Sequence, residues 1–507
     1  MSVARKILWN TGVQILGKAL VSALGVVVLK LITNYLGKSG YGNYTAAFEF
    51  LAFFSIVADL GLYTVGVREM AKKSDKVPMI IGNILTIRTI VAALIISCAI
   101  VSAYFIPQYQ GTKIPFAVLL VGVASVFNLL TSTISTVLQV YLKMGYSSFA
   151  SVVGKIINVG YIVIVIFWLY PNNNAVGFHQ IIWAGIIGNG VMLALTYYYS
   201  SKLTEIRYRI DVAFWKDVLV KALPYGVALV LNTIYFRIGA VLLSLMLNNP
   251  EEVGVYGVPM RMLEAVGIIP LYFMNAVLPV LTRSLARKDG SHQKIIQYAF
   301  DFLVMASVPI VAGTIVLAYP LIYLVSSPEF LSDLSKNIYG SDIILSILIF
   351  AMAFSFINSL FGFILVADNR QMKLLTRNAF GALLTIILNV IFIPYYGARA
   401  AAFTNVITEL YIVIASYLIA KHYVQFHINL KNTFKIIFAA LTMAAVIYFL
   451  RDPSYKLFQN KNLLLLVPLG GIIYTGMLFL TKAITKEMIA LIKKPKQNSE
   501  QVNTFIE

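Results

Sequence analysis

The chain has 507 residues, of which 59% are hydrophobic and only 12% are charged. Soluble domains carry about a quarter charged residues and under half apolar ones, so this composition excludes an ordinary soluble protein. The apolar residues form runs of roughly 20 residues, enough for a helix to cross a ~30 Å hydrocarbon core, and they lack strand alternation. The net charge of +19 comes from basic residues in short loops between these runs. That distribution is typical of membrane topology and argues against a nucleic-acid partner.

The sequence predicts an all-α integral membrane protein with about fourteen transmembrane helices. A short interfacial helix is expected at residues 3–10. The first apolar run is too long for the apolar core of a signal peptide, so we interpret it as a retained span. In chain order, the predicted spans are residues 12–36, 43–66, 78–106, 114–140, 149–170, 177–200, 218–247, 256–281, 296–325, 342–367, 376–394, 398–420, 434–450 and 462–481.

The loops between these spans alternate in charge. Most of the 40 Lys and Arg residues fall in one set of loops, and the opposite set holds few. Since basic loops remain on the cytoplasmic side, both termini are expected in the cytoplasm and the protein in the cell (inner or plasma) membrane.

An internal repeat relates the two halves of the chain. Gly42–Tyr44, at the start of a span, precedes Arg68–Lys73, and Gly254–Tyr256 likewise precedes Arg283–Lys288. Both copies read G-x-Y, a span, and then R-x-x-A followed by two basic residues. The offset between the halves drifts only from 212 to 223 residues along the chain. Because each copy contains an even number of spans, the two copies point the same way and form a parallel, pseudo-two-fold pair.

The repeat sets the expected domain boundaries. These are a six-helix bundle at 1–216, a second at 217–433, two additional transmembrane helices at 434–482 and a cytoplasmic tail at 483–507. Two parallel bundles around a central cavity are an architecture of alternating-access transporters.

Three stretches carry a family resemblance. Leu36–Tyr44 reads L-G-K-S-G-Y-G-N-Y, Ala58–Leu62 reads A-D-L-G-L, and Arg68 begins R-x-x-A. With these stretches, the repeat and the span count, the chain resembles the polysaccharide-export (Wzx-type O-antigen and oligosaccharide) flippases. That family belongs to the multidrug/oligosaccharidyl-lipid/polysaccharide (MOP) superfamily, which also contains the MATE transporters.

The resemblance implies a function as well as a fold. It implies two bundles around a cationic cavity that move a polyprenyl-(pyro)phosphate-linked oligosaccharide from the cytoplasmic to the outer leaflet, for surface polysaccharide assembly. It implies as partners this substrate, membrane lipids and further polysaccharide-assembly proteins. In relatives that flip the peptidoglycan precursor, the last two spans form a groove for the lipid tail, a role that residues 434–482 would take here.

Basic residues inside the spans are the candidates for binding the phosphate or sugar headgroup. An ionisable residue in a span costs at least ~2.5 kcal/mol and usually faces a cavity. The candidates are Arg88, Arg237, Lys18, Lys30, Lys155 and Arg261. Guanidinium groups match phosphate in bidentate geometry. The alternatives are an ion pair of Arg88 with Asp59, a local pair of Arg261 with Glu264, and lysines that reach back to the interface.

Acidic residues inside the spans are candidates for binding a coupling proton or sodium ion, or for gating. They are Asp59, Glu49, Glu264 and Glu409. A structural counter-ion is an equally good interpretation of Asp59. Cys98 is the only cysteine and the four histidines form no metal-ligand pattern, so no metal site and no cofactor are expected.

Three rival functions differ from a flippase in what they require of the sequence. A gradient-coupled exporter of drugs or other small molecules, from the same superfamily, predicts an acidic cavity. An enzyme such as an oligosaccharide polymerase requires a polar catalytic compartment, and the loops are too short to provide one. A receptor or scaffold leaves the repeat unexplained. The sequence therefore favours a flippase over an exporter, and a transport protein over an enzyme.

Overall fold

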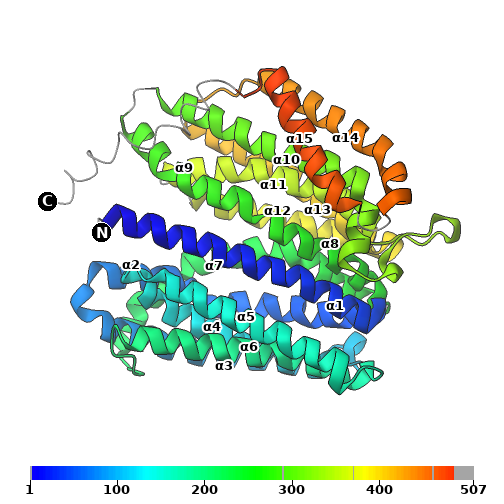
Figure 1. The fold of residues 1–507 in the computed structure, drawn as a ribbon. Helices are drawn as coiled ribbons and strands as arrows, with labels where there is room; N and C mark the ends of the chain where they lie inside the picture. Colours follow the sequence, from blue (N-terminus) through cyan, green and yellow to red (C-terminus); the bar gives the residue numbers. More distant parts are fainter. Residues whose placement is uncertain (1–2, 288–289, 369, 371, 459–461, 485–507) are drawn as a thin grey trace. The chain divides into compact units, whose positions relative to one another are not determined.

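The computed structural model describes residues 3–287, 290–368, 370, 372–458 and 462–484, and in these ranges the fold is all-helical (Figure 1). Thirteen helical stretches of this part of the chain are long and apolar enough to cross a membrane, which confirms an all-α, multi-pass membrane protein. The helices are α1 (Val3–Asp59), α2 (Leu62–Lys72), α3 (Val77–Phe105), α4 (Ile114–Val140), α5 (Met144–Ile164), α6 (Asn174–Ser201), α7 (Val212–Met246), α8 (Pro250–Val266), α9 (Ile268–Arg287), α10 (His292–Val325), α11 (Ser341–Ala367), α12 (Met372–Tyr396), α13 (Ala398–Tyr423), α14 (Lys431–Phe458) and α15 (Leu463–Leu480).

The first helix contains a reversal of the chain. A continuous helix of the 57 residues of α1 would be about 85 Å long, far more than a bilayer requires. Gly37 interrupts it with a φ of 67° and a ψ of −175°, a conformation open to glycine because it lacks a Cβ atom. In Figure 1 the chain runs from the N-terminus to the far end of α1 and then returns to α2. The thirteen stretches therefore include one, Gly12–Lys72, that holds two predicted spans, 12–36 and 43–66.

The start of α1 is also continuous. Helix α1 runs from Val3 without a break into the first predicted span, so residues 3–10 form its first turns and no separate helix.

Chain contacts divide the molecule into two compact units. Unit 1 holds 1–265, 322–344 and 375–408, and unit 2 holds 266–321, 345–374 and the described part of 409–507. The predicted boundaries after 216 and 433 follow the repeat and stay predictions, and most of the predicted tail lies outside the described residues.

A second interruption separates α1 from α2. Leu60 and Gly61 both have positive φ values, 48° and 71°. A Cβ atom at Gly61 would lie 2.6 Å from the Cβ atom of Tyr225 on α7. Glycine is therefore required both for the backbone conformation and for the approach of α7. The A-D-L-G-L motif thus ends α1 at Asp59 and turns the chain against α7.

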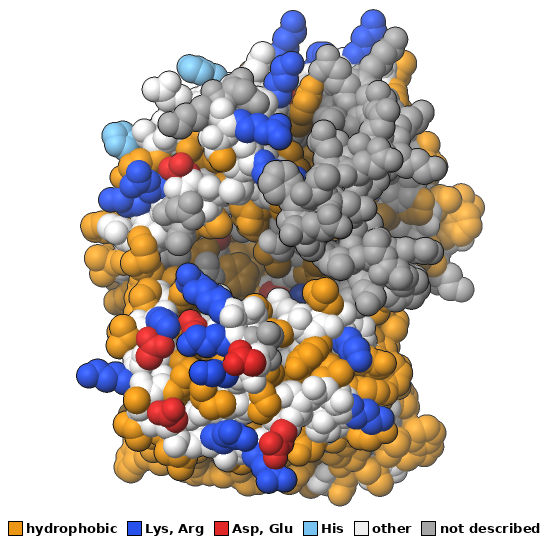
Figure 2. Space-filling model, turned by 90° about the vertical axis from the view of Figure 1, so that its left-hand side faces the viewer, with side chains coloured by type: hydrophobic (Ala, Val, Ile, Leu, Met, Phe, Trp, Pro, Cys, Tyr) orange, Lys and Arg blue, Asp and Glu red, His pale blue; other side chains and the backbone are white. Residues whose placement is uncertain are grey.

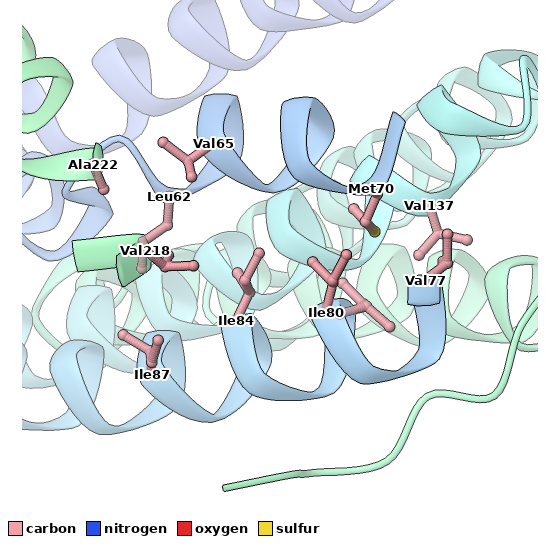
Figure 3. Close-up of a cluster of buried hydrophobic side chains, with 11 residues drawn as sticks. Leu62, Val65, Met70, Val77, Ile80, Ile84, Ile87, Val137, Val218 and Ala222 are labelled. Carbon is pink, nitrogen blue, oxygen red and sulfur yellow. The ribbon is translucent and has the colours of Figure 1, made fainter. Parts of the chain in front are cut away.

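Apolar side chains from four helices fix this part of unit 1 (Figure 3). On α3 the members of this cluster, at positions 77, 80, 81, 84 and 87, recur at spacings of three and four residues, which puts them on one helix face. Because lipid is as apolar as these side chains, close packing holds such helices together in a membrane. The buried members of the cluster are Leu62, Val65, Met70, Val77, Ile80, Ile81, Ile84, Ile87, Val137, Val218 and Ala222.

A polar contact anchors the extended segment that follows α6. The Thr86 hydroxyl donates to the carbonyl oxygen of Arg209 at 2.9 Å, and the backbone N–H of Asp211 donates to Oδ1 of Asn83 at 2.8 Å. Thr86 and Asn83 lie in the first turns of α3. Their side chains satisfy backbone groups that have no helical partner.

The segment that follows α13 in unit 2 is anchored in the same way. The backbone N–H groups of His427 and Asn429 donate to the side-chain oxygens of Gln293 and Gln297, at 2.9 and 2.8 Å. Gln293 and Gln297 lie in the first turns of α10. The segment after the sixth span of each repeat therefore docks against the start of that repeat's third span, which gives the sequence repeat a structural counterpart.

Lys and Arg side chains are frequent at the end of the molecule from which α1 starts. Figure 2 views this end, and its lower half shows basic side chains spread among fewer acidic ones. The α6–α7 connection contributes Arg207, whose side chain is 79% exposed.

Candidate functional site

The two G-x-Y motifs of the repeat meet each other in space. A Cβ atom at Gly42 on α1 would lie 1.7 Å from the carbonyl oxygen of Pro250, and one at Gly254 on α8 would lie 2.5 Å from that of Lys38. Gly42 and Gly254 are 212 residues apart, as are Lys38 and Pro250. The contact of Gly42 with Pro250 and the contact of Gly254 with Lys38 are therefore the same contact, made once from each copy of the repeat. The two copies cross on their pseudo-two-fold axis, and glycine is required there because the backbones of α1 and α8 touch.

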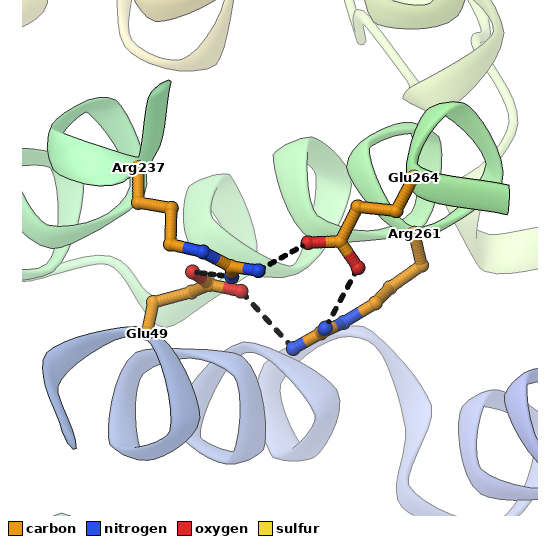
Figure 4. Close-up of polar contacts among 4 residues, drawn as sticks. All are labelled: Glu49, Arg237, Arg261 and Glu264. Atoms are coloured by element: carbon orange, nitrogen blue, oxygen red, sulfur yellow. Dashed lines mark hydrogen bonds and ion pairs between the residues drawn. The ribbon is translucent and has the colours of Figure 1, made fainter. Parts of the chain in front are cut away.

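About two helical turns beyond this crossing, four charged side chains form a closed ring of ion pairs (Figure 4). Glu49 Oε2 lies 2.6 Å from Nη1 of Arg237, and Arg237 Nη2 lies 2.7 Å from Oε1 of Glu264. Glu264 Oε2 lies 3.0 Å from Nη1 of Arg261, and Arg261 Nη2 lies 3.0 Å from Oε1 of Glu49. We call these four residues the ion-pair ring.

The ion-pair ring joins the two halves of the repeat. Glu49 lies on α1, Arg237 on α7, and Arg261 and Glu264 on α8. Each carboxylate bridges both guanidinium groups, so the four formal charges cancel. The ring is not sealed: the side chain of Glu49 is 7% exposed, whereas those of Arg237, Glu264 and Arg261 are 26%, 26% and 34% exposed. A ligand therefore has access to the arginines, but only in competition with the carboxylates.

A cavity beside the ring holds a further cation. Lys155 on α5 lines a cavity of about 360 Å³ together with Tyr44 and Phe48 of α1 and Asn158 of α5. Among the described residues, no hydrogen bond or ion pair neutralises its ammonium group. The charges of Lys155 and Arg261 lie close enough to repel each other. This cavity thus combines an unneutralised cation with aromatic faces and an amide.

Arg88 and Asp59 form a separate ion pair. Arg88 is fully buried on α3, and its guanidinium contacts the carboxylate of Asp59 at the end of α1. It also donates to the Thr133 hydroxyl at 3.0 Å and to the Ala58 carbonyl at 3.3 Å. The alternative interpretation of Arg88, an ion pair with Asp59, is thus the arrangement observed.

The remaining candidates are not members of the ring. The ammonium of Lys30 donates to the carbonyl oxygens of Tyr323 and Ser326, at 2.7 and 2.5 Å, where α10 ends. A cation at these carbonyls is favourable because they carry the negative end of the helix dipole. Lys18 lies at an exposed position of α1, and Glu409 is buried in α13. The structure therefore brings together Glu49, Arg237, Arg261 and Glu264 in the ring and pairs Arg88 with Asp59.

Some polar residues near these sites were not among the sequence candidates. Ser151 and Asn158 lie four residues before and three after Lys155, and all three line the cavity. Their spacing puts them on one helix face. A polar stripe on an apolar helix was the signal that would have found them. Thr133, the partner of Arg88, had no comparable signal because its helix carries several other hydroxyls. Among the described residues no group of three or more His, Cys, Asp or Glu is placed to hold a metal ion.

Comparison with solved structures identifies the fold. A structure titled lipid II flippase MurJ, inward closed conformation, aligns with a TM-score of 0.71 and 17% identity over 93% of this chain and 98% of its own. An inward-facing multidrug resistance MATE family transporter of the MOP superfamily aligns with a TM-score of 0.65 and 14% identity over 80% and 94%. A MOP superfamily transporter from Pyrococcus furiosus, whose title reports a binding pocket of reverse polarity, aligns with a TM-score of 0.56 and 15% identity over 83% and 94%. These likenesses confirm the predicted MOP/MATE-like fold.

Family models give the same assignment. The model described as polysaccharide biosynthesis protein matches residues 4–285, and the MatE model matches residues 224–391. Among curated proteins, none matches the chain. The proteins named in the structural comparison are flippases and transporters. Since the first of these models covers more than half of the 507 residues, the chain belongs to the polysaccharide biosynthesis protein family.

Proposed function

We propose that the protein is a flippase that moves a polyprenyl-(pyro)phosphate-linked oligosaccharide from the cytoplasmic to the outer leaflet by alternating access. In this proposal it resides in the cell membrane with both termini in the cytoplasm. The observation that carries the proposal is the cavity at Lys155. Its unneutralised ammonium suits a phosphate. The faces of Tyr44 and Phe48 suit sugar rings or the first isoprene units, and Asn158 suits hydroxyl groups.

The charge of this cavity separates the proposal from its rival. An exporter of drugs or other small molecules has support in the MatE match at residues 224–391. A carrier of cationic drugs requires unneutralised carboxylates. Glu49 and Glu264 are each paired with two arginines in the ion-pair ring. The free charge beside the ring is the positive charge of Lys155, which favours an anionic substrate.

The direction of transport and its driving force follow from the negative charge of the proposed substrate. With an inside-negative potential, outward movement of an anion is favourable by ~2.3 kcal/mol per charge per 100 mV. The membrane potential is therefore the driving force in this proposal. Of the candidate coupling carboxylates, Asp59, Glu49 and Glu264 are partners of arginines instead.

Reconstitution into liposomes tests the proposal. The protein should accelerate flipping of a fluorescent polyprenyl-diphosphate oligosaccharide, measured as label that becomes accessible to a membrane-impermeant quencher. Lys155→Gln should slow flipping at least tenfold at equal reconstitution, and Lys155→Arg should retain much of the rate. Lys143→Gln, at an exposed position between α4 and α5, is the matched control.

Two outcomes would overturn the proposal. Wild-type vesicles that flip no faster than empty ones would remove the flippase function. Uptake of cationic dyes that is driven by an ion gradient, together with unchanged transport by Lys155→Gln, would establish the drug exporter in its place.

A further inference from the structure

The ion-pair ring places two carboxylates where a phosphorylated substrate would bind. Each guanidinium group already donates to Glu49 through one nitrogen and to Glu264 through the other. Guanidinium groups bind carboxylate and phosphate with the same planar geometry. An incoming phosphate therefore does not find empty arginines, and it must replace a carboxylate that occupies the same donors.

We propose that Glu49 is a displaceable substitute for the substrate's diphosphate, and that its displacement releases α1 from α7 and α8. This inference rests on the proposed function, because it assigns the order of events at the same site. The two oxygens of Glu49 bridge Arg237 and Arg261, at 2.6 and 3.0 Å. A diphosphate can bridge the same two arginines through its two phosphoryl groups, with more negative charge than one carboxylate.

The position of Glu49 explains why its displacement would affect the helices. It is the member of the ring that comes from α1, so both of its ion pairs cross from α1 to α7 or α8. The bonds of Glu264 stay within α7 and α8. Replacement of Glu49 by a diphosphate keeps both arginines paired and removes the two ion pairs that hold α1.

The release of Glu49 would weaken the neighbouring crossing of α1 and α8. Gly42 and Gly254 lie about two helical turns from the ring, where the backbones of α1 and α8 touch. Without the ion pairs of Glu49, this contact is held by packing and by the pair of Lys38 and Glu251 at 3.4 Å, of which Glu251 is the exposed partner. An alternating-access carrier has to separate these helices in one half of its cycle. The substrate headgroup would thereby supply the signal for that step.

Lys155 gives the site a preference for the substrate over the ring. Around the site the cations are Arg237, Arg261 and Lys155, and the anions are Glu49 and Glu264. One positive charge is left over when the ring is closed. This excess positive charge attracts a polyanion. Once Glu49 leaves the arginines, a hydrogen bond from water or a bound proton is enough to satisfy its carboxylate.

Binding of inorganic pyrophosphate to the purified full-length protein tests the inference. Titration calorimetry would compare the wild type with Glu49→Gln, Glu264→Gln, Arg237→Gln and Arg261→Gln. Glu49→Gln and Glu264→Gln should each tighten pyrophosphate binding at least tenfold, because each removes a carboxylate that competes with pyrophosphate for the arginines. Both arginine substitutions should weaken it at least tenfold. Glu205→Gln, in the α6–α7 connection and outside both the ring and the crossing, should bind as the wild type does.

The outcomes separate this inference from the proposed function. If the arginine variants lose affinity but neither glutamate variant gains it, the ring binds anions without carboxylate exchange, and the inference falls while the flippase proposal stands. If the arginine variants bind as the wild type does, or no form of the protein binds pyrophosphate, the ring is not the anion site and the inference falls again. The flipping assay with Lys155→Gln decides the proposed function independently. Glu264→Gln serves as the second variant should Glu49→Gln fail to fold.

Discussion

At the scale of single residues, the charges inside the spans serve two different purposes. Arg88 and Asp59 form a pair in which the arginine is fully buried and the carboxylate is 20% exposed. Removal of one partner of such a pair leaves an uncompensated charge in a medium of low polarity. Arg237, Arg261 and Glu264 of the ion-pair ring are instead partly exposed. In the proposed function, this difference in burial separates a structural ion pair from the residues that bind the substrate.

Substitution of Arg88 should act on stability and not on substrate binding. Arg88→Ala should lower the free energy of unfolding by about 3–5 kcal/mol, because Asp59 is left without its partner. The double variant Arg88→Leu, Asp59→Leu should recover most of this loss. Unfolding in detergent, followed by circular dichroism, measures both. A double variant that folds normally but flips no substrate would instead assign Arg88 to the transport site.

At the scale of helices, close backbone contacts explain the glycines of the family-like motifs. At Gly42 and Gly254 a single methyl group would overlap a carbonyl oxygen of the opposite helix, at 1.7 and 2.5 Å. At Gly25, also on α1, a methyl group would have no neighbour within 4 Å. The motif glycines therefore set the distance between α1 and α8, and through it the distance across the ion-pair ring.

Alanine substitutions should reveal this difference. Gly42→Ala and Gly254→Ala should each lower the melting temperature, since α1 and α8 have to move apart to make room. Gly25→Ala should be neutral or stabilise the protein by about 0.5–1 kcal/mol, the ordinary gain for alanine within a helix. Thermal unfolding in one detergent provides the comparison. Equal melting temperatures for Gly42→Ala and Gly25→Ala would contradict the packing argument.

The sequence predicted the helices well but missed one of their breaks. Apolar runs locate spans because their length is set by the bilayer, and the break at Gly37 falls between the predicted spans 12–36 and 43–66. The break at Leu60 and Gly61 lies inside the predicted span 43–66, where Gly61 meets Tyr225 of α7. The local pair of Arg261 and Glu264 was an alternative available from spacing alone. The pairing of Glu49 with Arg237, 188 residues away, depends on how the two halves meet, and no local pattern encodes that.

At the scale of the whole molecule, the proposed orientation makes a prediction for chemical labelling. In a Cys98→Ser background, Lys336→Cys should react with a membrane-impermeant maleimide in intact cells. Arg207→Cys should react only after the membrane is permeabilised. Both side chains are well exposed, at 72% and 79%, so accessibility to solvent is matched. The opposite pattern would reverse the orientation and with it the proposed direction of transport.

The crossing of the two repeat copies also has an evolutionary consequence. In a homodimer of a single repeat, a two-fold axis brings the same residue together with itself. Glu49 and Arg261 are equivalent positions, 212 residues apart, yet they carry opposite charges and lie 3.0 Å apart. Two identical copies would place two glutamates or two arginines there and would repel each other. Fusion of both copies into one gene let the two positions diverge, so a neutral pair on the axis is available to the fused chain and not to a homodimer.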